Sequence, residues 1–359
     1  MSCCRRRIIA ELRIALHVRI VPAETTWTPA LLVIDHSLNG AVRTRSPRRK
    51  EFKPMTPTAS PALRPSCLPP LELYRPSDLG ELFACVAAGA CPLAGGTDLM
   101  VWASQHGEPQ QWAWTGGIDE WRLVDISDKQ VRIGAAVTLA QAVRFRELRS
   151  LISAVIDGAA VVGSVQLRNQ ATLVGNVCTA SPGGDTLPGL YVHDAMVEVV
   201  NAAGSRRSVK ISEFLCAPGK TNLAPGELVT GLTLCGLGPH EGSTFHRFTQ
   251  RNALDLAIAS VAARVRFESD GQTVAQASLA LGAVGPTVLD VADAAALLVG
   301  HALEPSRLRQ CAALAAESCR PITDHRASQD YRRQLVQTLT MDVVAAAAAR
   351  ARGSIAMTL

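Results

Sequence analysis

The feature that most constrains this chain is a pair of glycine-rich segments about eighty residues apart. The first is Leu93-Ala94-Gly95-Gly96-Thr97-Asp98-Leu99, and the second runs from Thr172 through Gly175-Asn176 to Asp185. Glycine lets backbone N–H groups approach phosphate oxygens because no Cβ stands between the amide and the ligand. The threonine hydroxyls can donate, and an asparagine amide can donate and accept. Each segment alone is typical of a strand-ending turn, but together they indicate a site for a polyphosphate cofactor.

The order of these and further motifs resembles the FAD-binding medium subunit of molybdenum hydroxylases, such as the xanthine and carbon monoxide dehydrogenases. The resemblance extends from about Leu71 to the C-terminus, and the order of the motifs makes it specific. The motifs are Tyr74-Arg75-Pro76-Ser77, Ala94 to Leu99, Arg168-Asn169-Gln170-Ala171-Thr172, Gly175-Asn176, Ala180-Ser181-Pro182, Asp185, Gly219-Lys220-Thr221-Asn222-Leu223, Glu227-Leu228 and Arg251 to Asp255 with Leu256-Ala257.

The resemblance implies an α+β fold, in which a two-subdomain FAD-binding domain of the PCMH type precedes a C-terminal domain. That second domain would have a small antiparallel sheet packed by helices. We expect the FAD-binding domain over residues 69–237 and the C-terminal domain over 243–355. Residues 1–68 do not match the family, and we interpret them as a disordered arm or as a start placed too far upstream. Met55 is then a candidate initiator.

The family also implies the residues that bind FAD. Leu93 to Leu99 would wrap the pyrophosphate, with Thr97 donating its hydroxyl. Thr172, Gly175 and Asn176 would hold the phosphates from the other side. No catalytic residue and no metal ligand is expected, because a flavin supplies its own redox chemistry.

Further implied contacts concern the rest of the cofactor. Asp185 would accept hydrogen bonds from the ribityl or adenosine portion, Leu223 would lie near the isoalloxazine ring and Val162 near the adenine. Arg247 would be a cation near the flavin, where the family tends to have lysine. A second departure is Val174, where the family usually has glycine. Because valine rarely adopts a positive φ, we expect this position to be extended or the loop to differ in shape.

The charge distribution argues against nucleic-acid binding. Residues 1–54 have eleven Lys or Arg and four acidic residues, whereas the remainder has 25 basic and 27 acidic residues. The basic pI therefore belongs to the N-terminal arm, and the remainder lacks a basic patch for nucleic acid. No run reaches the roughly 18 apolar residues of a membrane span.

The cysteines and histidines do not show metal-ligand spacing. None of the ten cysteines forms a C-x-x-C pair, which argues against zinc or iron–sulfur ligation. Scattered thiols fit a reducing cytoplasm. We interpret His193 beside Asp194 as a surface or loop pair. Two further motifs are incomplete: Gly219-Lys220-Thr221 lacks the earlier glycine of a P-loop, and Gly236, Gly238 and Gly242 miss the Rossmann spacing.

Apolar periodicity predicts the main elements. One helix begins near Leu79 with Ser77 as its N-cap, and a single helix covers 148–162. Strands are expected at 91–94, 123–126, 131–133, 195–200, 208–211 and 228–234, and an antiparallel sheet at 245–248, 257–267 and 277–284. Other helices are expected at 138–145, 292–298 and 331–351.

Three functions fit this sequence. The first is an electron-transfer subunit that takes electrons from an iron–sulfur small subunit, beside a molybdopterin large subunit, and passes them through FAD to NAD or another acceptor. The second is a stand-alone FAD-dependent oxidase or dehydrogenase. The third is a fold relative that has lost FAD, which the departures at Val174 and Arg247 allow. The absence of iron–sulfur cysteines and of an evident substrate base favours the first over the second.

Overall fold

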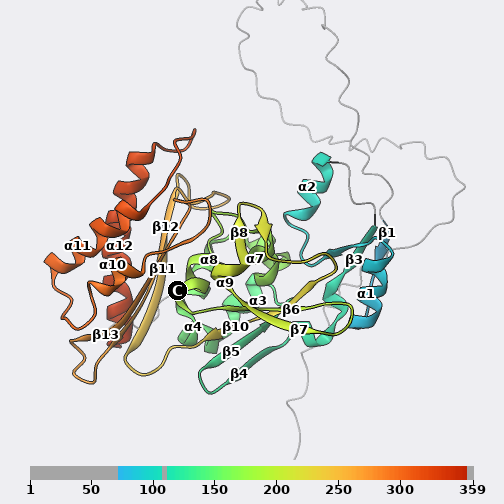
Figure 1. The fold of residues 1–359 in the computed structure, drawn as a ribbon, viewed down its shortest axis with the longest axis horizontal. Coiled ribbons are helices and arrows are strands. Elements are labelled where there is room, and N and C mark those ends of the chain that lie inside the picture. The colour runs from blue at the N-terminus through green and yellow to red at the C-terminus, as the bar shows by residue number, and fades with distance from the viewer. Residues whose placement is uncertain (1–71, 107–110, 354–359) are drawn as a thin grey trace, which may run out of the picture. The chain divides into compact units, whose positions relative to one another are not determined.

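The structure is a computed structural model that describes residues 72–106 and 111–353 (Figure 1). The predicted N-terminal arm and Met55 lie outside these residues. Within them, no helix is long and apolar enough to cross a membrane.

The chain first forms a small parallel sheet. Its strands lie in the order β1 (Glu72–Tyr74), β3 (Gln111–Trp114), β2 (Cys91–Leu93), with α1 (Leu79–Ala87) between β1 and β2. Helix α1 is capped by Asp78, whose carboxylate accepts from the Glu81 amide at 2.8 Å, so the predicted Ser77 cap is wrong. Ser77 lies one residue earlier and donates to the Glu81 carboxylate instead, which forms a reciprocal contact across the first turn.

A five-stranded antiparallel sheet forms the centre of the FAD-binding region. Its order is β4 (Val124–Ser127), β5 (Gln130–Gly134), β10 (Leu228–Cys235), β6 (Met196–Val200), β7 (Arg206–Lys210). Helices pack around it and enclose a core that includes Leu139, Ile156 and Phe214. These elements are α3 (Leu139–Arg144), α4 (Arg146–Leu151), α5 (Ser153–Val161), α6 (Val165–Gln170), α7 (Leu173–Thr179), α8 (Leu187–Val192), α9 (Ile211–Phe214) and the hairpin of β8 (Leu215–Ala217) with β9 (Lys220–Thr221), together with the 3-10 turns Thr115–Gly117 and Asp119–Arg122.

Two expectations in this region are wrong. The single helix expected over 148–162 is two helices, because Ile152 leaves the helical conformation at φ −136°. The segment after Thr172, expected as a phosphate loop, begins with α7. Val174 lies inside that helix, so it is neither extended nor in need of a positive φ. The departure from the family glycine is thus compatible with the local backbone.

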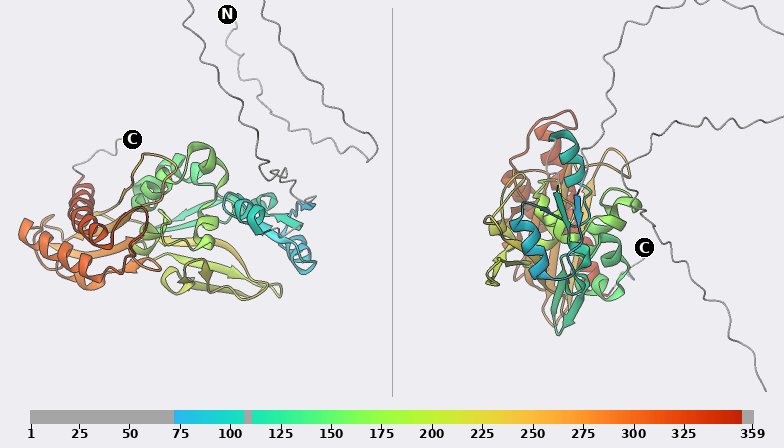
Figure 2. Two further views of the ribbon diagram at one scale, coloured as in Figure 1. Left: turned by 90° about the horizontal axis from the view of Figure 1, so that it is seen from above. Right: turned by 90° about the vertical axis from the view of Figure 1, so that its right-hand side faces the viewer.

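The C-terminal region is a four-stranded antiparallel sheet with helices. Its strands are β11 (Glu241–Phe248), β12 (Ala259–Phe267), β13 (Val274–Gly282) and β14 (Leu289–Asp290), in that order. The helices are α10 (Ala292–Ala296), α11 (Pro305–Ser318) and α12 (Gln329–Ala351), of which α11 was not predicted. Figure 2 shows these helices together on one side of the sheet.

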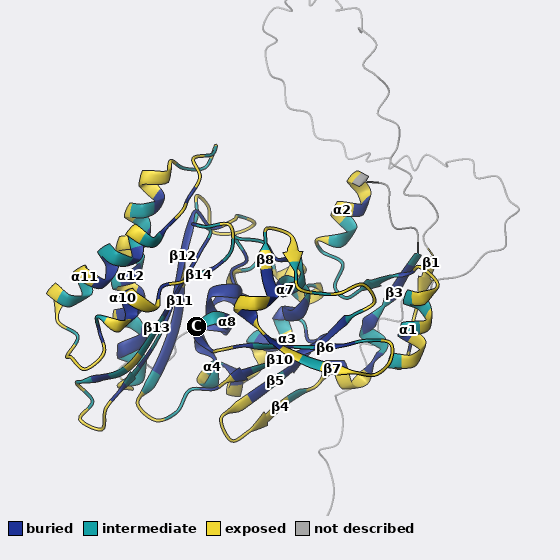
Figure 3. Ribbon diagram, in the orientation of Figure 1, coloured by how far each residue is buried: buried dark blue, intermediate teal, exposed yellow. Residues whose placement is uncertain are grey.

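Strand β12 of this sheet is buried at most of its positions on both faces and is dark in Figure 3. Side chains alternate across a strand. On β12, Val261 and Ala263 therefore join the core beneath α11 and α12, whereas Ala262 joins the core of the FAD-binding region. This explains why β12 is apolar at consecutive positions. The predicted α+β class and the C-terminal sheet with its helices are confirmed.

His193 and Asp194 lie in the turn after α8, as the loop interpretation expects, but His193 is fully buried, so a surface position is wrong for it. It lies just after α8, where its Nδ1–H donates to the Cys235 carbonyl and its Nε2 lies 2.8 Å from the Ser243 hydroxyl of β11. Burial lowers the pKa of His193 to about 4, so the ring is neutral. It therefore joins the two regions through hydrogen bonds.

Candidate functional site

The two glycine-rich segments meet in the structure. The loop from Ala94 to Asp98 leaves β2 and enters α2 (Leu99–His106), with Gly96 at φ +70°. A Cβ placed on Gly95 would lie 2.0 Å from the Gln170 carbonyl oxygen, so only glycine permits this approach of two backbones. Leu93 ends β2 and Leu99 begins α2, so both lie at the edges of the loop rather than within it.

One side-chain bond also joins the segments. The Thr179 hydroxyl lies 3.0 Å from Asp98 Oδ2 and 3.0 Å from the Gly175 carbonyl. Thr172 caps α7, because its hydroxyl oxygen accepts from the Gly175 amide at 2.9 Å. The structure therefore brings together the residues predicted for the two sides of the phosphates.

Thr97 and Asn176 differ in how they are held. Asn176 is half-buried, and its Oδ1 accepts from the Thr186 hydroxyl at 2.6 Å, which leaves its amide N–H groups as donors. Thr97 is half-buried in the loop between β2 and α2. Both residues thus retain some exposed surface, whereas Thr172 is buried at the N-cap of α7.

Asp185 and Arg247 form a buried ion pair. Each side chain is 7% exposed, and Arg247 Nη1 donates to Asp185 Oδ2 and also to the Asp255 carbonyl at 3.3 Å. Burial raises the pKa of Asp185 to about 6, although the neighbouring guanidinium opposes the rise. The pair thus places a cation beside a carboxyl group whose pKa is higher than usual.

The second carboxylate oxygen of this pair, Asp185 Oδ1, is buried and has no hydrogen-bond partner among the described residues. A buried acceptor without a donor is costly, and natural proteins leave few of them. A hydroxyl or N–H of a bound ligand would satisfy it. FAD offers such donors on its ribityl chain, its sugar and its rings, so the residues present fit this cofactor.

Leu223 and Val162 lie at other parts of the region. Leu223 is half-buried against the first core, beyond the β8–β9 hairpin, which reaches the end of α7 through the Gly219 amide and the Ala180 carbonyl at 3.0 Å. Val162 follows α5 and is half-buried, and its carbonyl accepts from Arg168 at 2.9 Å. Their proposed contacts with the flavin and the adenine stay predictions.

Sequence reasoning assigned no role to three residues of this region, Thr179, Thr186 and Asp255, although Asp255 ends one of the motifs that carry the family resemblance. Asp255 accepts from the backbone amides of Gln250, Arg251 and Leu256, which fixes the segment after β11. Thr179 and Thr186 have no motif of their own. Only the helical turn after Thr172 would have indicated that Thr179 lies one turn beyond Gly175.

Comparison with known proteins shows which family the chain resembles. Residues 69–234 match the FAD binding domain in molybdopterin dehydrogenase, and residues 244–347 match the CO dehydrogenase flavoprotein C-terminal domain. The two matches follow each other in order and together span most of the chain. This chain belongs to the family of FAD-binding medium subunits of molybdenum hydroxylases. It is accordingly a flavoprotein subunit of the oxidoreductase class, and its cofactor is FAD.

Relatives of this FAD-binding subunit include the xanthine dehydrogenase FAD-binding subunit of Escherichia coli O157:H7. It is 27% identical over 270 residues, 73% of this chain and 90% of the relative. The nicotinate dehydrogenase FAD-subunit of Eubacterium barkeri is 26% identical over 68% of this chain and 83% of its own length. Quinoline 2-oxidoreductase from Pseudomonas putida 86 has a similar structure, with a TM-score of 0.74 and 25% identity over 79% of this chain and 99% of that chain.

Proposed function

We propose that this subunit transfers electrons within a larger molybdenum hydroxylase. It would receive electrons from the iron–sulfur clusters of a small subunit, beside a molybdopterin large subunit, and pass them through FAD to NAD or another acceptor. Relatives named as subunits support this assembly, among them the nicotine 6-hydroxylase medium subunit of Paenarthrobacter nicotinovorans. When bound, FAD supplies the redox chemistry, and the protein binds and tunes it.

The observation that supports this function most is the unpaired Asp185 Oδ1 beside Arg247, because Asp185 lies in the same region as the two joined glycine segments. We propose that Ala94 to Asp98, with Leu93 and Leu99 at its edges, and Thr172, Gly175 and Asn176 hold the phosphates. Asp185 would accept from a hydroxyl or N–H of FAD, and Arg247 would be the adjacent cation. Leu223 and Val162 would pack against the flavin and adenine ends.

A stand-alone flavin oxidase is the second candidate, and one observation bears on it. The pKa of Asp185, about 6, lies in the range of a general base. Its ion pair with Arg247 and its burial instead favour a binding role, because one of its two oxygens is already occupied by the guanidinium. The free thiols of the described cysteines suit a reducing compartment, and we propose a cytoplasmic location.

The test separates the two candidates. The purified subunit, loaded with FAD and without partners, is mixed with a panel of purines, aldehydes and N-heterocycles, and flavin bleaching is recorded. We expect no rapid bleaching by any organic substrate, and slow reduction by NADH at most. Rapid bleaching by one of these substrates would overturn the subunit function in favour of an independent oxidase.

A further inference from the structure

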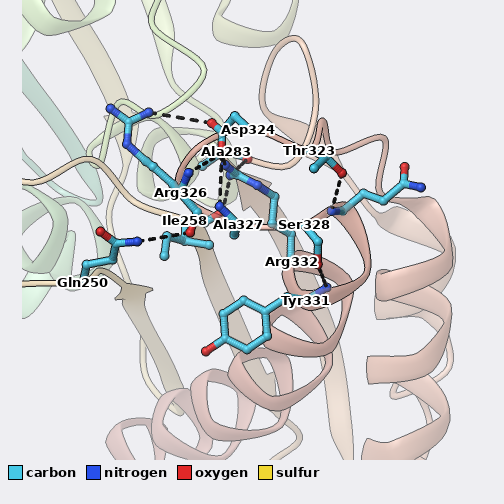
Figure 4. Close-up of polar contacts among 11 residues, drawn as sticks. Gln250, Ile258, Ala283, Thr323, Asp324, Arg326, Ala327, Ser328, Tyr331 and Arg332 are labelled. Carbon is cyan, nitrogen blue, oxygen red and sulfur yellow. Dashed lines mark hydrogen bonds and ion pairs between the residues drawn. The ribbon is translucent and has the colours of Figure 1, made fainter.

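A buried arginine binds backbone carbonyls of segments that contact the Asp185–Arg247 region. Arg332, on α12, is 4% exposed, and its Nη1 donates to the Ile258 carbonyl at 2.6 Å and to the Ala283 carbonyl at 3.1 Å. Its Nη2 donates to Asp324 Oδ1 at 2.8 Å. Figure 4 shows this guanidinium reaching between the loop that contains Asp324 and the two carbonyls.

Both carbonyls belong to residues adjacent to the candidate site. Ala283 has a φ of +62°, and its amide donates to the Pro182 carbonyl at 2.8 Å, three residues before Asp185. Ile258 follows the segment fixed by Asp255, and its amide donates to the Phe248 carbonyl at 2.8 Å. Arg332 therefore holds backbone on the Asp185 side and on the Arg247 side at once.

A second connection passes through the loop of Asp324. Asp324 Oδ1 also accepts from the amides of Arg326 and Ala327, at 2.9 and 3.1 Å. The Arg326 carbonyl accepts from the Gln250 side chain at 3.1 Å. The Gln250 amide in turn donates to Asp255 Oδ2 at 2.9 Å, and the Asp255 carbonyl accepts from Arg247.

The energetics argue against a purely stabilising role for Arg332. A buried guanidinium loses its hydration, and apolar residues of similar volume are often as stable or more stable in its place. Its Nε–H has no hydrogen-bond partner among the residues described, which adds to the cost. Burial would raise the pKa of Asp324, but the Arg326 amide, Arg332 and the Ala327 amide hold it at about 2, so the counter-charge is present at neutral pH.

We propose that Arg332, held by Asp324, is a positioning residue for the flavin site. It fixes the Ile258 and Ala283 carbonyls and, through the loop bonded to Gln250, the segment 249–257. Arg247 and Asp185 are thereby kept facing each other with one carboxylate oxygen free. This inference rests on the proposed placement of FAD at Asp185.

The test uses the full chain and four proteins: wild type, Gln250→Ala, Arg332→Lys and the control Ser328→Ala. Gln250 is exposed, so its replacement removes the connection without opening the core. Ser328 caps α12 in the same loop, where its hydroxyl accepts from the Tyr331 amide at 3.2 Å. Its carbonyl accepts from the Arg332 amide at 3.1 Å, and Ser328→Ala leaves that backbone bond and the guanidinium contacts of Arg332 unchanged. Loss of this cap lowers the melting temperature without moving the flavin site.

Three quantities are measured: the Kd for FAD by fluorescence quenching, the pH midpoint of FAD binding, and the melting temperature of the apoprotein. We expect Gln250→Ala and Arg332→Lys to bind FAD roughly three- to tenfold more weakly, as for one lost hydrogen bond. Their pH midpoint should rise, because a displaced Arg247 opposes the raised pKa of Asp185 less well. Ser328→Ala should lower the melting temperature and leave the Kd for FAD and the pH midpoint unchanged.

Wild-type affinity and midpoint in Gln250→Ala and Arg332→Lys would overturn the proposal. If Arg332→Lys does not fold, Gln250→Ala alone decides, and equal losses of affinity in Ser328→Ala would also count against a positioning role. Failure of the wild-type chain to bind FAD would instead refute the proposed function, so the two failures are distinguishable.

Discussion

The two halves of the candidate site are held together by different kinds of contact. At the glycine segments, the essential contacts are made by backbone, with Gly95 against the Gln170 carbonyl and Thr172 capping α7. At the other half, charged side chains make the contacts, through the buried pair of Asp185 with Arg247 and the support of Arg332. The first half depends on the absence of side chains and the second on their pairing.

This difference determines how each half responds to change. A backbone contact fails when any Cβ is added, whatever its polarity. A buried charge pair fails when one partner is removed, because the remaining charge is left without compensation.

The largest effect is expected from Gly95→Val. The new Cβ would lie 2.0 Å from the Gln170 carbonyl oxygen, so the two segments must separate. We expect the purified variant to contain almost no flavin by absorbance. Gly183→Ala is the matched control, because its Cβ would meet the nearest side chain at 3.7 Å, an ordinary contact. Full flavin content in Gly95→Val would show that the glycine segments do not bind the cofactor.

Removal of Arg247 should destabilise the chain in a pH-dependent way. Arg247→Ala leaves a buried carboxylate unpaired, a loss of about 3–5 kcal/mol in the free energy of unfolding. The pKa of Asp185 is already raised to about 6, and it rises further without the guanidinium. In the folded variant, Asp185 is therefore still protonated at pH 5, so the loss of stability relative to the wild type should appear above pH 6 and grow as the pH rises further.

Chemical denaturation at pH 5 and pH 8 measures this difference. Arg247→Lys retains the charge and should lose far less stability at either pH. An equal loss for Arg247→Ala at both values would mean that the buried pair does not govern this half of the site.

A smaller effect is expected from Thr97→Ala and Asn176→Ala. Each variant removes a hydrogen bond to a charged group, worth roughly 1.5–3 kcal/mol, which is about a ten- to hundredfold loss in FAD affinity. Ser104→Ala is the control, because its hydroxyl on α2 donates to the Val101 carbonyl. The melting temperatures of the apoproteins should stay close to that of the wild type, and undiminished affinity in both variants would contradict the placement of the phosphates.

The smallest effect concerns pH. A hydrogen bond from FAD to Asp185 Oδ1 favours the ionised carboxylate, so protonation near pH 6 opposes binding. We expect affinity to be constant above pH 7 and to fall by about tenfold towards pH 5. Asp185→Asn should abolish this dependence, and a variant that still shows it would place the titrating group elsewhere.

The same contrast explains what the sequence could predict. The glycine segment at 93–99 was recognisable because its residues are local and glycine is needed for close approach. The charged half was not: Asp185 and Arg247 are 62 positions apart, and no local pattern pairs them. Only the resemblance to the family indicated both residues, and nothing indicated Arg332, whose partners are distant carbonyls.

The prediction of secondary structure and burial from the sequence failed for related reasons. The stretch after Thr172 contains glycine and asparagine, which are poor helix formers, yet tertiary packing of Leu173 and Val177 makes it a helix. His193 follows a short helix whose residues are nearly all buried, and its partner Ser243 is 50 positions away. Short helices that depend on tertiary packing leave little trace in the local sequence. The same is true of buried polar contacts between residues far apart in the chain.

The most direct test of this account is calorimetric titration of the apoprotein with FAD, for wild type, Gly95→Val and Asp185→Asn. We predict one FAD per wild-type chain, no detectable binding to Gly95→Val and weakened binding to Asp185→Asn, because both halves hold the same cofactor molecule. A wild-type chain that takes up no FAD, or variants that bind it as tightly as the wild type, would contradict the account.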